Sequence, residues 1–368
     1  MRKVTAKALG FGVAIFAFLE LLVLSPTIFF VNILLLILGL VLVLASLIDA
    51  LWTALWVDGG AGPLTTHITN IVWWIMRKLI RTKRNYWLSL AGPLIQTITV
   101  FFWVGLLWVG WVIVYSSDND SLIYTRTPEN MPGDLASRIY FVAYTITTIG
   151  NGDLYPKGNG WEIVASFTGL SGMFLITMVV SFLLSVIGGV TTKRSLASQI
   201  TGLGSSSEEF ILNIWSGKGF PGLDLQLMLM TSQLGTLTEQ QLAYPVLHRY
   251  HGATYKEDSA PAIAILDDAL TLLKYGVQEQ YRPAPLVLKS ARETVHTYLK
   301  TLASASIYPA DHVPPSPDLE PLRKAGIPVV SDEEFARSLQ ELTHRRKLLL
   351  GLVEHNSFKW PYTTNSRP

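Results

Sequence analysis

The chain of 368 residues is apolar for its length: 49% of its residues are hydrophobic, and its mean hydropathy is +0.35. This composition excludes an ordinary soluble enzyme and fits a membrane domain followed by a second domain. The net charge of +2, with no basic stripe, gives no case for nucleic-acid binding. The absence of cysteine from the sequence excludes disulfides, thiolate metal sites and thiol redox switches.

The charged residues are concentrated in the second half of the chain. Residues 1–190 hold 11 basic and 9 acidic side chains, whereas residues 191–368 hold 18 of each. The first half is therefore predicted to lie in a membrane, and the second half to be a water-facing domain with almost no net charge. The predicted boundary falls near Thr191.

Residues 1–57 are predicted to form a transmembrane hairpin. Two apolar runs, residues 8–24 and 28–56, each approach or exceed the roughly 20 residues that a helix needs to cross a membrane. Ser25-Pro26-Thr27 separates the runs and is predicted to be a tight turn. A cleaved secretory signal is the alternative for the first run, although Val23-Leu24-Ser25-Pro26 is a poor small-residue cleavage site.

Two carboxylates, Glu20 and Asp49, lie inside these runs. Ionisable groups within a membrane span are candidates for function, but we expect both to be paired for structural reasons. An enzyme would need a polar catalytic cluster, and Glu20, Asp49 and His67 are too scattered to form one. The sequence therefore predicts no enzymatic activity.

Residues 62–84 are predicted to form an amphipathic helix that lies in the membrane interface. Apolar residues recur at helical spacing from Leu64 to Leu79, and the segment ends in a basic cluster between Arg77 and Arg84. Such a helix suits contact with lipid headgroups. Membrane lipids are thus expected partners.

Residues 85–190 are predicted to form a second membrane domain. It begins with an apolar outer helix over residues 85–115, whose tryptophans 103, 108 and 111 are expected to anchor it at the membrane interface. A polar, acidic segment follows, and the domain ends with an inner helix over residues 162–189. All short basic stretches of the chain fall on one side if the spans alternate, which predicts that both termini are cytoplasmic.

Between the outer and inner helices lies the sequence Thr147-Thr148-Ile149-Gly150-Asn151-Gly152-Asp153. In a soluble protein, Asn-Gly between apolar runs would predict a tight hairpin turn. The stretch resembles the selectivity filter of the potassium-channel family, whose pattern is Thr-Thr-aliphatic-Gly-aromatic-Gly-Asp, and departs from it at Asn151. The resemblance covers about residues 88–190 and implies that residues 85–190 form a pore domain. It implies passive potassium conduction through backbone carbonyls, with no cofactor besides potassium ions in the filter.

The residue types of this motif suit a ladder of carbonyls. Gly150 and Gly152 can take positive φ, so that successive carbonyls turn toward one axis instead of alternating as in a strand. The preceding segment, residues 135–147, is predicted to be a short helix whose carbonyl end points at the ion path. One loop cannot surround an ion, and the resemblance therefore implies a homotetramer. The expected ion ligands are the carbonyls of Thr148, Ile149, Gly150, Asn151 and Gly152.

The resemblance also implies roles for residues around the filter. Tyr140 and Tyr144 would brace it, with a hydrogen bond from Tyr140 to Asp153, although core packing explains both tyrosines equally well. Gly172 stands where the family has its inner-helix hinge, and close helix packing is the alternative. The expected cavity-lining residues are Met173, Ile176 and Val180, and the expected apolar gate is Leu184 or Ile187.

The departure at Asn151 has a predicted consequence for selectivity. The family's aromatic side chain packs behind the filter and holds its diameter, whereas asparagine is shorter and polar. Hydrogen bonds to Tyr140 or Tyr144 would replace part of that packing. We expect a softer filter that prefers potassium over sodium less strongly.

Residues 191–368 are predicted to form a helical cytoplasmic domain. Helix starts are indicated near Ser207, Thr238 and Ser331, the last by a capping box, and the prolines between Tyr308 and Pro328 indicate an extended strap. His248 and His251 have a spacing that suits one helix face, but two histidines are a weak case for a metal site. The role of this domain stays open, as does the existence of a gating ligand.

The predicted fold is an all-α membrane protein with four transmembrane helices, one re-entrant pore loop and a helical cytoplasmic C-terminal domain. The predicted function is a homotetrameric potassium channel of the cell membrane. A poorly selective monovalent cation channel of the same fold is the alternative in mechanism. A transporter of the same filter superfamily would carry four pore loops in one chain, and this sequence has one.

Overall fold

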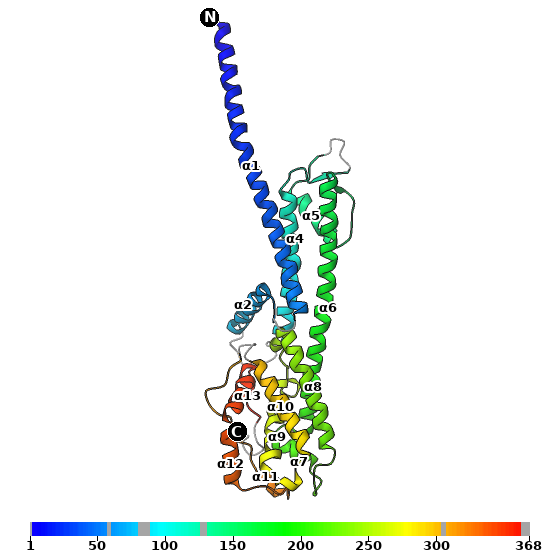
Figure 1. The fold of residues 1–368 in the computed structure, drawn as a ribbon, viewed down its shortest axis with the longest axis vertical. Coiled ribbons are helices and arrows are strands. Elements are labelled where there is room, and N and C mark those ends of the chain that lie inside the picture. Colours follow the sequence, from blue (N-terminus) through cyan, green and yellow to red (C-terminus); the bar gives the residue numbers. More distant parts are fainter. Residues whose placement is uncertain (1, 57–59, 80–88, 126–130, 303–306, 362–368) are drawn as a thin grey trace. The chain divides into compact units, whose positions relative to one another are not determined.

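The computed structural model describes residues 2–56, 60–79, 89–125, 131–302 and 307–361, with side chains from residue 29 onward except those at 77 and 79. The chain divides into two compact units, and Figure 1 labels their α-helices. The first unit comprises Met1–Leu51 and Val100–Val180, and the second comprises Trp52–Thr99 and Ser181–Pro368. The long helices α1 (Arg2–Leu55), α4 (Ala91–Ser116) and α6 (Asn159–Leu203) contribute residues to both units.

Helix α1 runs without interruption from Arg2 to Leu55. The turn predicted at Ser25–Thr27 is therefore wrong, and residues 1–57 do not form a hairpin. Ser-Pro-Thr contains no glycine to reverse the chain direction, and the apolar runs on both sides favour helix. Among the residues searched, three segments are long and apolar enough to cross a membrane: Phe29–Leu55, Ala91–Ser116 and Asn159–Leu203. The side chains of the first predicted span, residues 8–24, lie outside the described part. The side chain of Glu20 lies outside the described part.

Helices α1 and α4 pack closely within the first unit. A Cβ atom built on Gly39 would lie 2.7 Å from the carbonyl oxygen of Gly110, so the crossing requires glycine. In the same helix pair, the indole nitrogen of Trp103 in α4 donates a hydrogen bond of 2.9 Å to the Asp49 carboxylate in α1, and both side chains are buried. The structural pairing predicted for Asp49 is confirmed.

The remainder of the first unit surrounds the short helix α5 (Leu135–Ile146). Strand β1 (Leu122–Tyr124) precedes this helix, and strand β2 (Leu154–Pro156) follows it. The two strands pair antiparallel, with Tyr124 opposite Leu154. These strands were not predicted from the sequence, because three residues are too few for an alternating pattern to be recognised.

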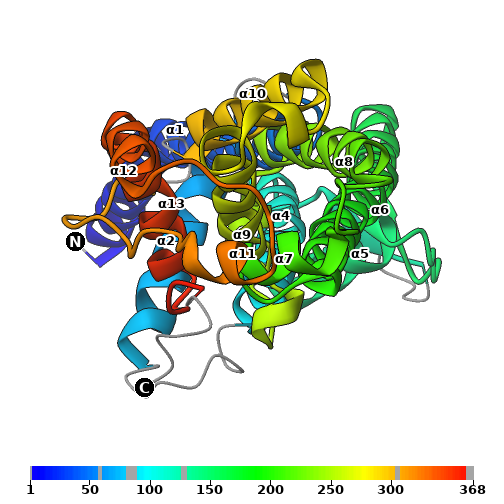
Figure 2. The ribbon, with the colours of Figure 1, turned by 90° about the horizontal axis from the view of Figure 1, so that it is seen from below.

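The second unit is helical and has an extensive apolar core. Helices α8 and α10 pack side by side along it (Figure 2), and every residue of α9 is buried. Its elements are α2 (Pro63–Leu79), α7 (Ser207–Ile214), α8 (Leu223–Ala243), η1 (Pro245–Arg249), η2 (Tyr255–Glu257), α9 (Ser259–Thr271), η3 (Leu272–Gly276), η4 (Glu279–Tyr281), α10 (Pro285–Thr301), α11 (Glu320–Lys324), α12 (Asp332–Glu341) and α13 (Thr343–His355).

Two of the three helix starts predicted for this unit are confirmed. The Ser206 hydroxyl accepts the Glu209 amide at the start of α7, and the Ser331 hydroxyl accepts the Glu334 amide at the start of α12. The start predicted at Thr238 is wrong, because this residue lies inside α8. Its hydroxyl donates to the carbonyl of Leu234 one turn earlier and does not cap a helix.

The second unit includes more of the chain than the predicted domain of residues 191–368. Trp73 of α2 packs with Ala91 and Ile95 around the start of α4, and Val246 of η1 completes this cluster. The opposite face of α2 exposes apolar side chains, as expected for a helix in a membrane interface: Ile71, Trp74 and Ile75. The predicted basic cluster falls largely outside the described residues.

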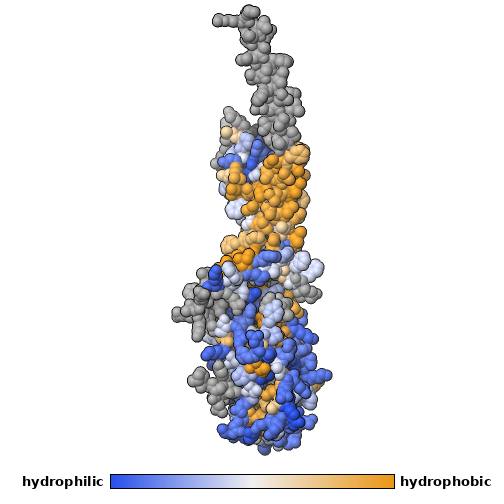
Figure 3. All heavy atoms as spheres, turned by 90° about the vertical axis from the view of Figure 1, so that its left-hand side faces the viewer, coloured by the Kyte–Doolittle hydropathy of each residue, from blue (hydrophilic) through white to orange (hydrophobic). Residues whose placement is uncertain are grey.

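The surface polarity follows the predicted division of the chain. In Figure 3, apolar side chains cover the visible surface of the candidate spans, and polar side chains cover most of the C-terminal helices. The described part of α1 exposes large apolar side chains on nearly every turn, among them Phe29, Leu34 and Val41. Such a surface is stable in a lipid environment and not in water.

Candidate functional site

Helix α5 is held at its N-terminus by polar contacts. The Asp134 carboxylate accepts the backbone amide of Ser137 at 2.8 Å and the Ser137 hydroxyl at 2.5 Å, and these hydrogen bonds lower the pKa of Asp134. The Tyr124 hydroxyl joins the same Ser137 oxygen. In addition, the Arg138 guanidinium donates to the carbonyls of Asp118 and Asn119. The segment between α4 and α5 therefore fixes the position of α5.

The C-terminus of α5 leads directly into the motif. The amide of Ile149 donates to the carbonyl of Tyr144 at 2.8 Å, and the amide of Thr148 donates to that of Thr145 at 3.1 Å. This is a Schellman motif, which requires a left-handed residue after the helix. Thr148 takes that position with φ of 59°. A β-branched residue is strained there, so the surrounding contacts must enforce the conformation.

Positive φ recurs at every second residue of the candidate filter, defined as residues 147–153. Thr148, Gly150 and Gly152 have φ of 59°, 63° and 74°, and the residues between them have negative φ. An ordinary strand has negative φ throughout, and its successive peptide groups point to opposite sides. Because positive and negative φ alternate in the candidate filter, its successive peptide groups do not follow this strand pattern. The prediction that both glycines take positive φ is confirmed. Thr148 also takes positive φ, which was not predicted.

The tyrosines of α5 contact the candidate filter differently from the prediction. The Asn151 side-chain amide donates to the Tyr140 hydroxyl at 2.5 Å, which is one of the hydrogen bonds expected of asparagine here. The Tyr144 hydroxyl donates to the carbonyl of Leu154 at 3.1 Å. The bond predicted from Tyr140 to Asp153 is wrong, because the Tyr140 hydroxyl is directed to Asn151. Among the described residues, no group pairs with Oδ1 of Asp153.

A clamp formed by Thr125 fixes the end of the candidate filter. The Thr125 hydroxyl donates to the carbonyl of Gly152 at 3.0 Å, and its amide donates to the carbonyl of Asp153 at 3.0 Å. These bonds continue the pairing of β1 with β2. The Gly152 carbonyl was predicted to be an ion ligand. It has a structural partner in the protein, which limits its availability to an ion.

Gly172 of α6 contacts Ile146, the residue that precedes the candidate filter. A Cβ atom built on Gly172 would lie 2.3 Å from the carbonyl oxygen and 2.6 Å from the Cα of Ile146, the last residue of α5. Glycine is thus required for the approach of the two backbones, as the packing alternative predicts. Helix α6 is continuous through this point. A hinge role for Gly172 stays a prediction.

The residues predicted to line a cavity share an exposed face of α6. Met173, Ile176 and Val180 are between 44% and 53% exposed in the single chain. The predicted gate residues Leu184 and Ile187, which belong to the second unit, are also exposed. These side chains are free to face either a pore or other chains. No contact within the described chain assigns them a different role.

Comparisons with known proteins agree with this geometry. A family model described as an ion channel matches residues 99–188, the segment that contains α5, the candidate filter and the predicted inner helix. The chain belongs to the potassium-channel-type family of pore-loop proteins. Over 323 residues it is 42% identical to the uncharacterized membrane protein YdjJ of Bacillus subtilis, with 88% of this chain and 94% of that protein covered. No solved structure matches.

Tryptophans of α4 connect the parts of this pore-loop unit. The indole nitrogen of Trp108 donates to the carbonyl of Ile139 in α5, and that of Trp111 donates to the Ser171 hydroxyl in α6. Trp103 bonds Asp49 in α1. Because Trp103 and Trp111 are almost completely buried, they do not act as the predicted interfacial anchors. The sequence contains no signal that separates the two roles, since both require an apolar ring with one donor.

Of the two histidines considered for a metal site, His251 belongs to a stacked aromatic cluster in the second unit, whereas no ring contact is found for His248 among the described residues. His251 and His355 stack on Trp73 with centroid distances of 5.5 and 6.0 Å. His248 is buried, and burial lowers its pKa to about 3. The described residues contain no group of three or more potential metal ligands.

Proposed function

We propose that the protein is a potassium channel that conducts ions passively across the cell membrane. The observation that carries this proposal is the alternating left-handed backbone at Thr148, Gly150 and Gly152. It supports a row of carbonyls on one side of the chain, which replaces the hydration shell of a dehydrated cation. Potassium ions bound by the carbonyls of residues 148–151 are the only cofactor in this proposal. Both termini are proposed to be cytoplasmic.

The proposal includes a re-entrant pore loop and four chains around one axis. The candidate filter is exposed in the single chain, with Ile149 67% exposed. A carbonyl ring needs several loops, and one chain contributes one loop. The exposed apolar face of α6 suits contact with the same central pathway. The second unit is proposed to regulate the pore, because α6 belongs to both units.

Crosslinking is expected to give a ladder of species that ends at four chains. The experiment uses the full-length protein in its native membranes and a short amine-reactive crosslinker. A ladder ending at two, with no larger species at any crosslinker concentration, would contradict the fourfold arrangement.

Ion selectivity is tested with the purified protein in planar bilayers under opposing sodium and potassium gradients. A potassium channel shifts its reversal potential toward the potassium equilibrium potential, and a poorly selective cation channel leaves it near zero. The absence of any cation current under all conditions would contradict channel function.

The hydrogen bond between Asn151 and Tyr140 leads to a prediction about selectivity. In Tyr140→Phe, the aromatic ring stays but the Asn151 amide loses its acceptor, so the candidate filter becomes softer. We expect a lower ratio of potassium to sodium permeability, by roughly two- to tenfold, since one hydrogen bond contributes about 0.5–1.5 kcal/mol. The control is Tyr308→Phe, whose side chain is exposed in the second unit. A ratio unchanged in Tyr140→Phe would show that this bond does not hold the filter.

Asn151→Tyr restores the family's aromatic residue and is expected to raise the same ratio, measured in one bilayer system. If the unmodified channel already excludes sodium strongly and Asn151→Tyr leaves the ratio unchanged or lower, asparagine is a full substitute for the aromatic ring.

A further inference from the structure

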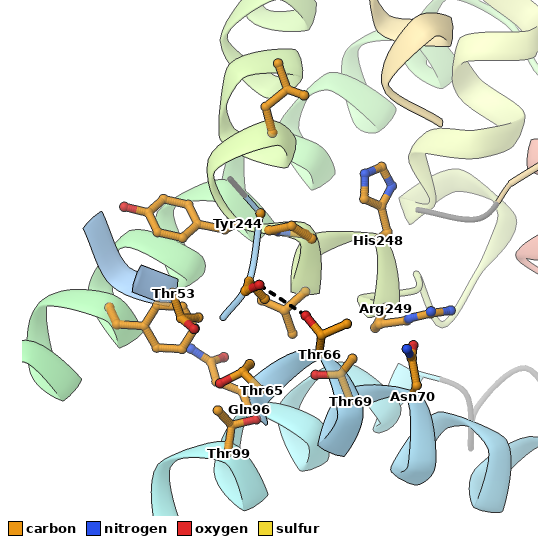
Figure 4. A pocket seen from close by; sticks show the side chains of 16 residues that line it. Thr53, Thr65, Thr66, Thr69, Asn70, Gln96, Thr99, Tyr244, His248 and Arg249 are labelled. Carbon is orange, nitrogen blue, oxygen red and sulfur yellow. Dashed lines mark hydrogen bonds between the residues drawn. The ribbon is translucent and has the colours of Figure 1, made fainter. Parts of the chain in front are cut away.

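A cavity of about 380 Å³ lies within the second unit, at a distance in sequence from the candidate filter. It is formed by the segment before α2, by α2 itself, and by parts of α4, α6 and η1 (Figure 4). Small-molecule sites in proteins typically measure about 300–1,000 Å³. The cavity is thus large enough for a small metabolite or a lipid headgroup.

Two buried polar side chains in the cavity wall have polar atoms without a partner among the described residues. Gln96 is 4% exposed, and its amide nitrogen donates to no acceptor. His248 is also 4% exposed, and its Nε2 has no partner. Buried polar atoms are almost always hydrogen-bonded. Two such atoms in the wall of one cavity indicate that a ligand supplies their partners.

The charge of the cavity wall favours an anion. Arg249 lines the cavity, and its guanidinium lies 4.5 Å from the ring centroid of Trp73. Among the described lining residues, none is acidic. His248 stays neutral, because burial and the nearby cations Lys193 and Arg249 lower its pKa to about 3. Its imidazole therefore offers a donor or an acceptor without adding a charge.

The remaining polar lining suits hydroxyl groups. Thr65, Thr69 and Asn70 of α2 line the cavity, and Figure 4 shows Asn70 beside Arg249 and Thr65 beside Gln96. Threonine hydroxyls and a carboxamide can each donate and accept, as can the hydroxyls of a polyol. Arginine is the side chain best suited to a phosphate, because its fork of donors matches two phosphate oxygens.

We propose that this cavity binds a small phosphate ester that carries hydroxyl groups, with the phosphate on Arg249 and the hydroxyls toward Gln96 and the threonines of α2. Such a group occurs in the glycerol phosphate headgroup of a membrane lipid and in soluble sugar or glycerol phosphates. The chemistry is the same in both sources.

A ligand bound in the cavity would lie against α6, the helix that leads to the predicted gate. Phe182, which lines the cavity, belongs to α6 two residues before the predicted gate residue Leu184. A bound ligand therefore contacts the helix that we propose to line the ion path. This regulatory part rests on the proposed channel function, whereas the binding part does not.

The test measures binding to the purified full-length chain in detergent by calorimetry. The soluble probe is glycerol 3-phosphate, and the lipid probe is dihexanoyl phosphatidylglycerol, with dihexanoyl phosphatidylcholine as its zwitterionic counterpart. We expect saturable binding of one of the two anionic probes. The probe that binds identifies the source. Absence of saturable binding of both at millimolar concentration would overturn the proposal.

The variants link binding to the cavity. Arg249→Gln is expected to weaken binding about tenfold or more, since a charge-assisted pair is lost, and Arg249→Lys is expected to retain part of it. Thr69→Trp fills the cavity without touching a charge and should abolish binding, which keeps the test valid if Arg249→Gln does not fold. The control is Arg337→Gln on α12, outside the cavity. Equal affinity in the two cavity variants and the control would overturn the site.

The regulatory part is tested by potassium flux from vesicles containing the full-length protein. A saturating concentration of the probe that binds is expected to change the flux of the unmodified protein and to leave the flux of Thr69→Trp unchanged. Unchanged flux in both proteins would overturn the coupling. Absence of flux under every condition would instead contradict channel function and leave the binding result intact.

Discussion

Gly172→Ala is expected to lose most of its ion flux, whereas Gly169→Ala keeps it. The added methyl group at position 172 would lie 2.3 Å from the carbonyl oxygen of Ile146, and backbone atoms cannot move away as a flexible side chain does. Over-packing of this kind costs about 1–3 kcal/mol. Relief of the clash displaces the end of α5, from which Thr148 and the candidate filter continue. Flux of potassium or thallium into vesicles measures the effect.

Gly169 is a matched control one turn earlier on α6. A Cβ atom there meets only Thr145 atoms at 3.8 Å, which is ordinary contact. Both substitutions raise helix propensity by about 1 kcal/mol, so this effect cancels in the comparison. Equal flux in the two variants would contradict the packing role. A change in open probability with unchanged single-channel conductance in Gly172→Ala would instead favour the hinge.

Arg346→Met is expected to lower the free energy of unfolding by about 3–5 kcal/mol, the usual cost of breaking a buried ion pair. Arg346 is 2% exposed and donates to both Asp268 oxygens at 3.2 and 3.1 Å, as well as to the carbonyls of Pro314 and Pro315. It therefore joins α13, α9 and the proline-rich strap. Without it, a buried carboxylate and two carbonyls lose their donor. Denaturant unfolding of the protein in detergent measures the difference.

Arg323→Met is the control for this variant. Arg323 pairs with Glu320 and Asp332, but its side chain is 43% exposed, and a pair in solvent contributes about 1 kcal/mol or less. Similar losses in the two variants would contradict the role assigned to the buried pair.

The stability deficit of Arg346→Met is expected to depend on pH. Burial raises the pKa of Asp268 to about 7, even with Arg346 beside it. Removal of the arginine raises this pKa further, so the folded variant holds the proton more tightly than the unfolded chain does. A group with a raised folded-state pKa stabilises the fold below that pKa and loses this contribution as pH rises. The deficit relative to the unmodified protein should thus grow above about pH 7.

The sequence predicts the elements whose signals are local. The left-handed glycines of the candidate filter and the helix start at Ser331 each depend on a few adjacent residues, and the structure contains them. The turn predicted at Ser25–Thr27 is wrong, because the long apolar runs on both sides favour a continuous helix over the local Ser-Pro-Thr signal. Local patterns therefore predicted the existence of elements better than their interruptions.

The contacts that the sequence did not reveal join residues far apart in the chain. Val246 packs on Trp73, and Thr125 bonds Gly152, yet neither pair has a spacing that marks it. The second unit could not be delimited for the same reason, because residues 52–99 join it through tertiary packing alone. A buried arginine such as Arg346 is indistinguishable in sequence from an exposed one such as Arg323 until the packing around it is known.

The hydrogen bond between Asp49 and Trp103 has a consequence for biosynthesis. The two residues are 54 positions apart, so at about 5–20 residues per second the ribosome adds Trp103 roughly 3–11 s after Asp49. During that interval, the carboxylate of α1 has no indole donor, and a charged group is costly in the hydrocarbon of a membrane. Stable insertion of α1 is therefore expected to await synthesis of α4, with the two helices leaving the translocation machinery as a pair.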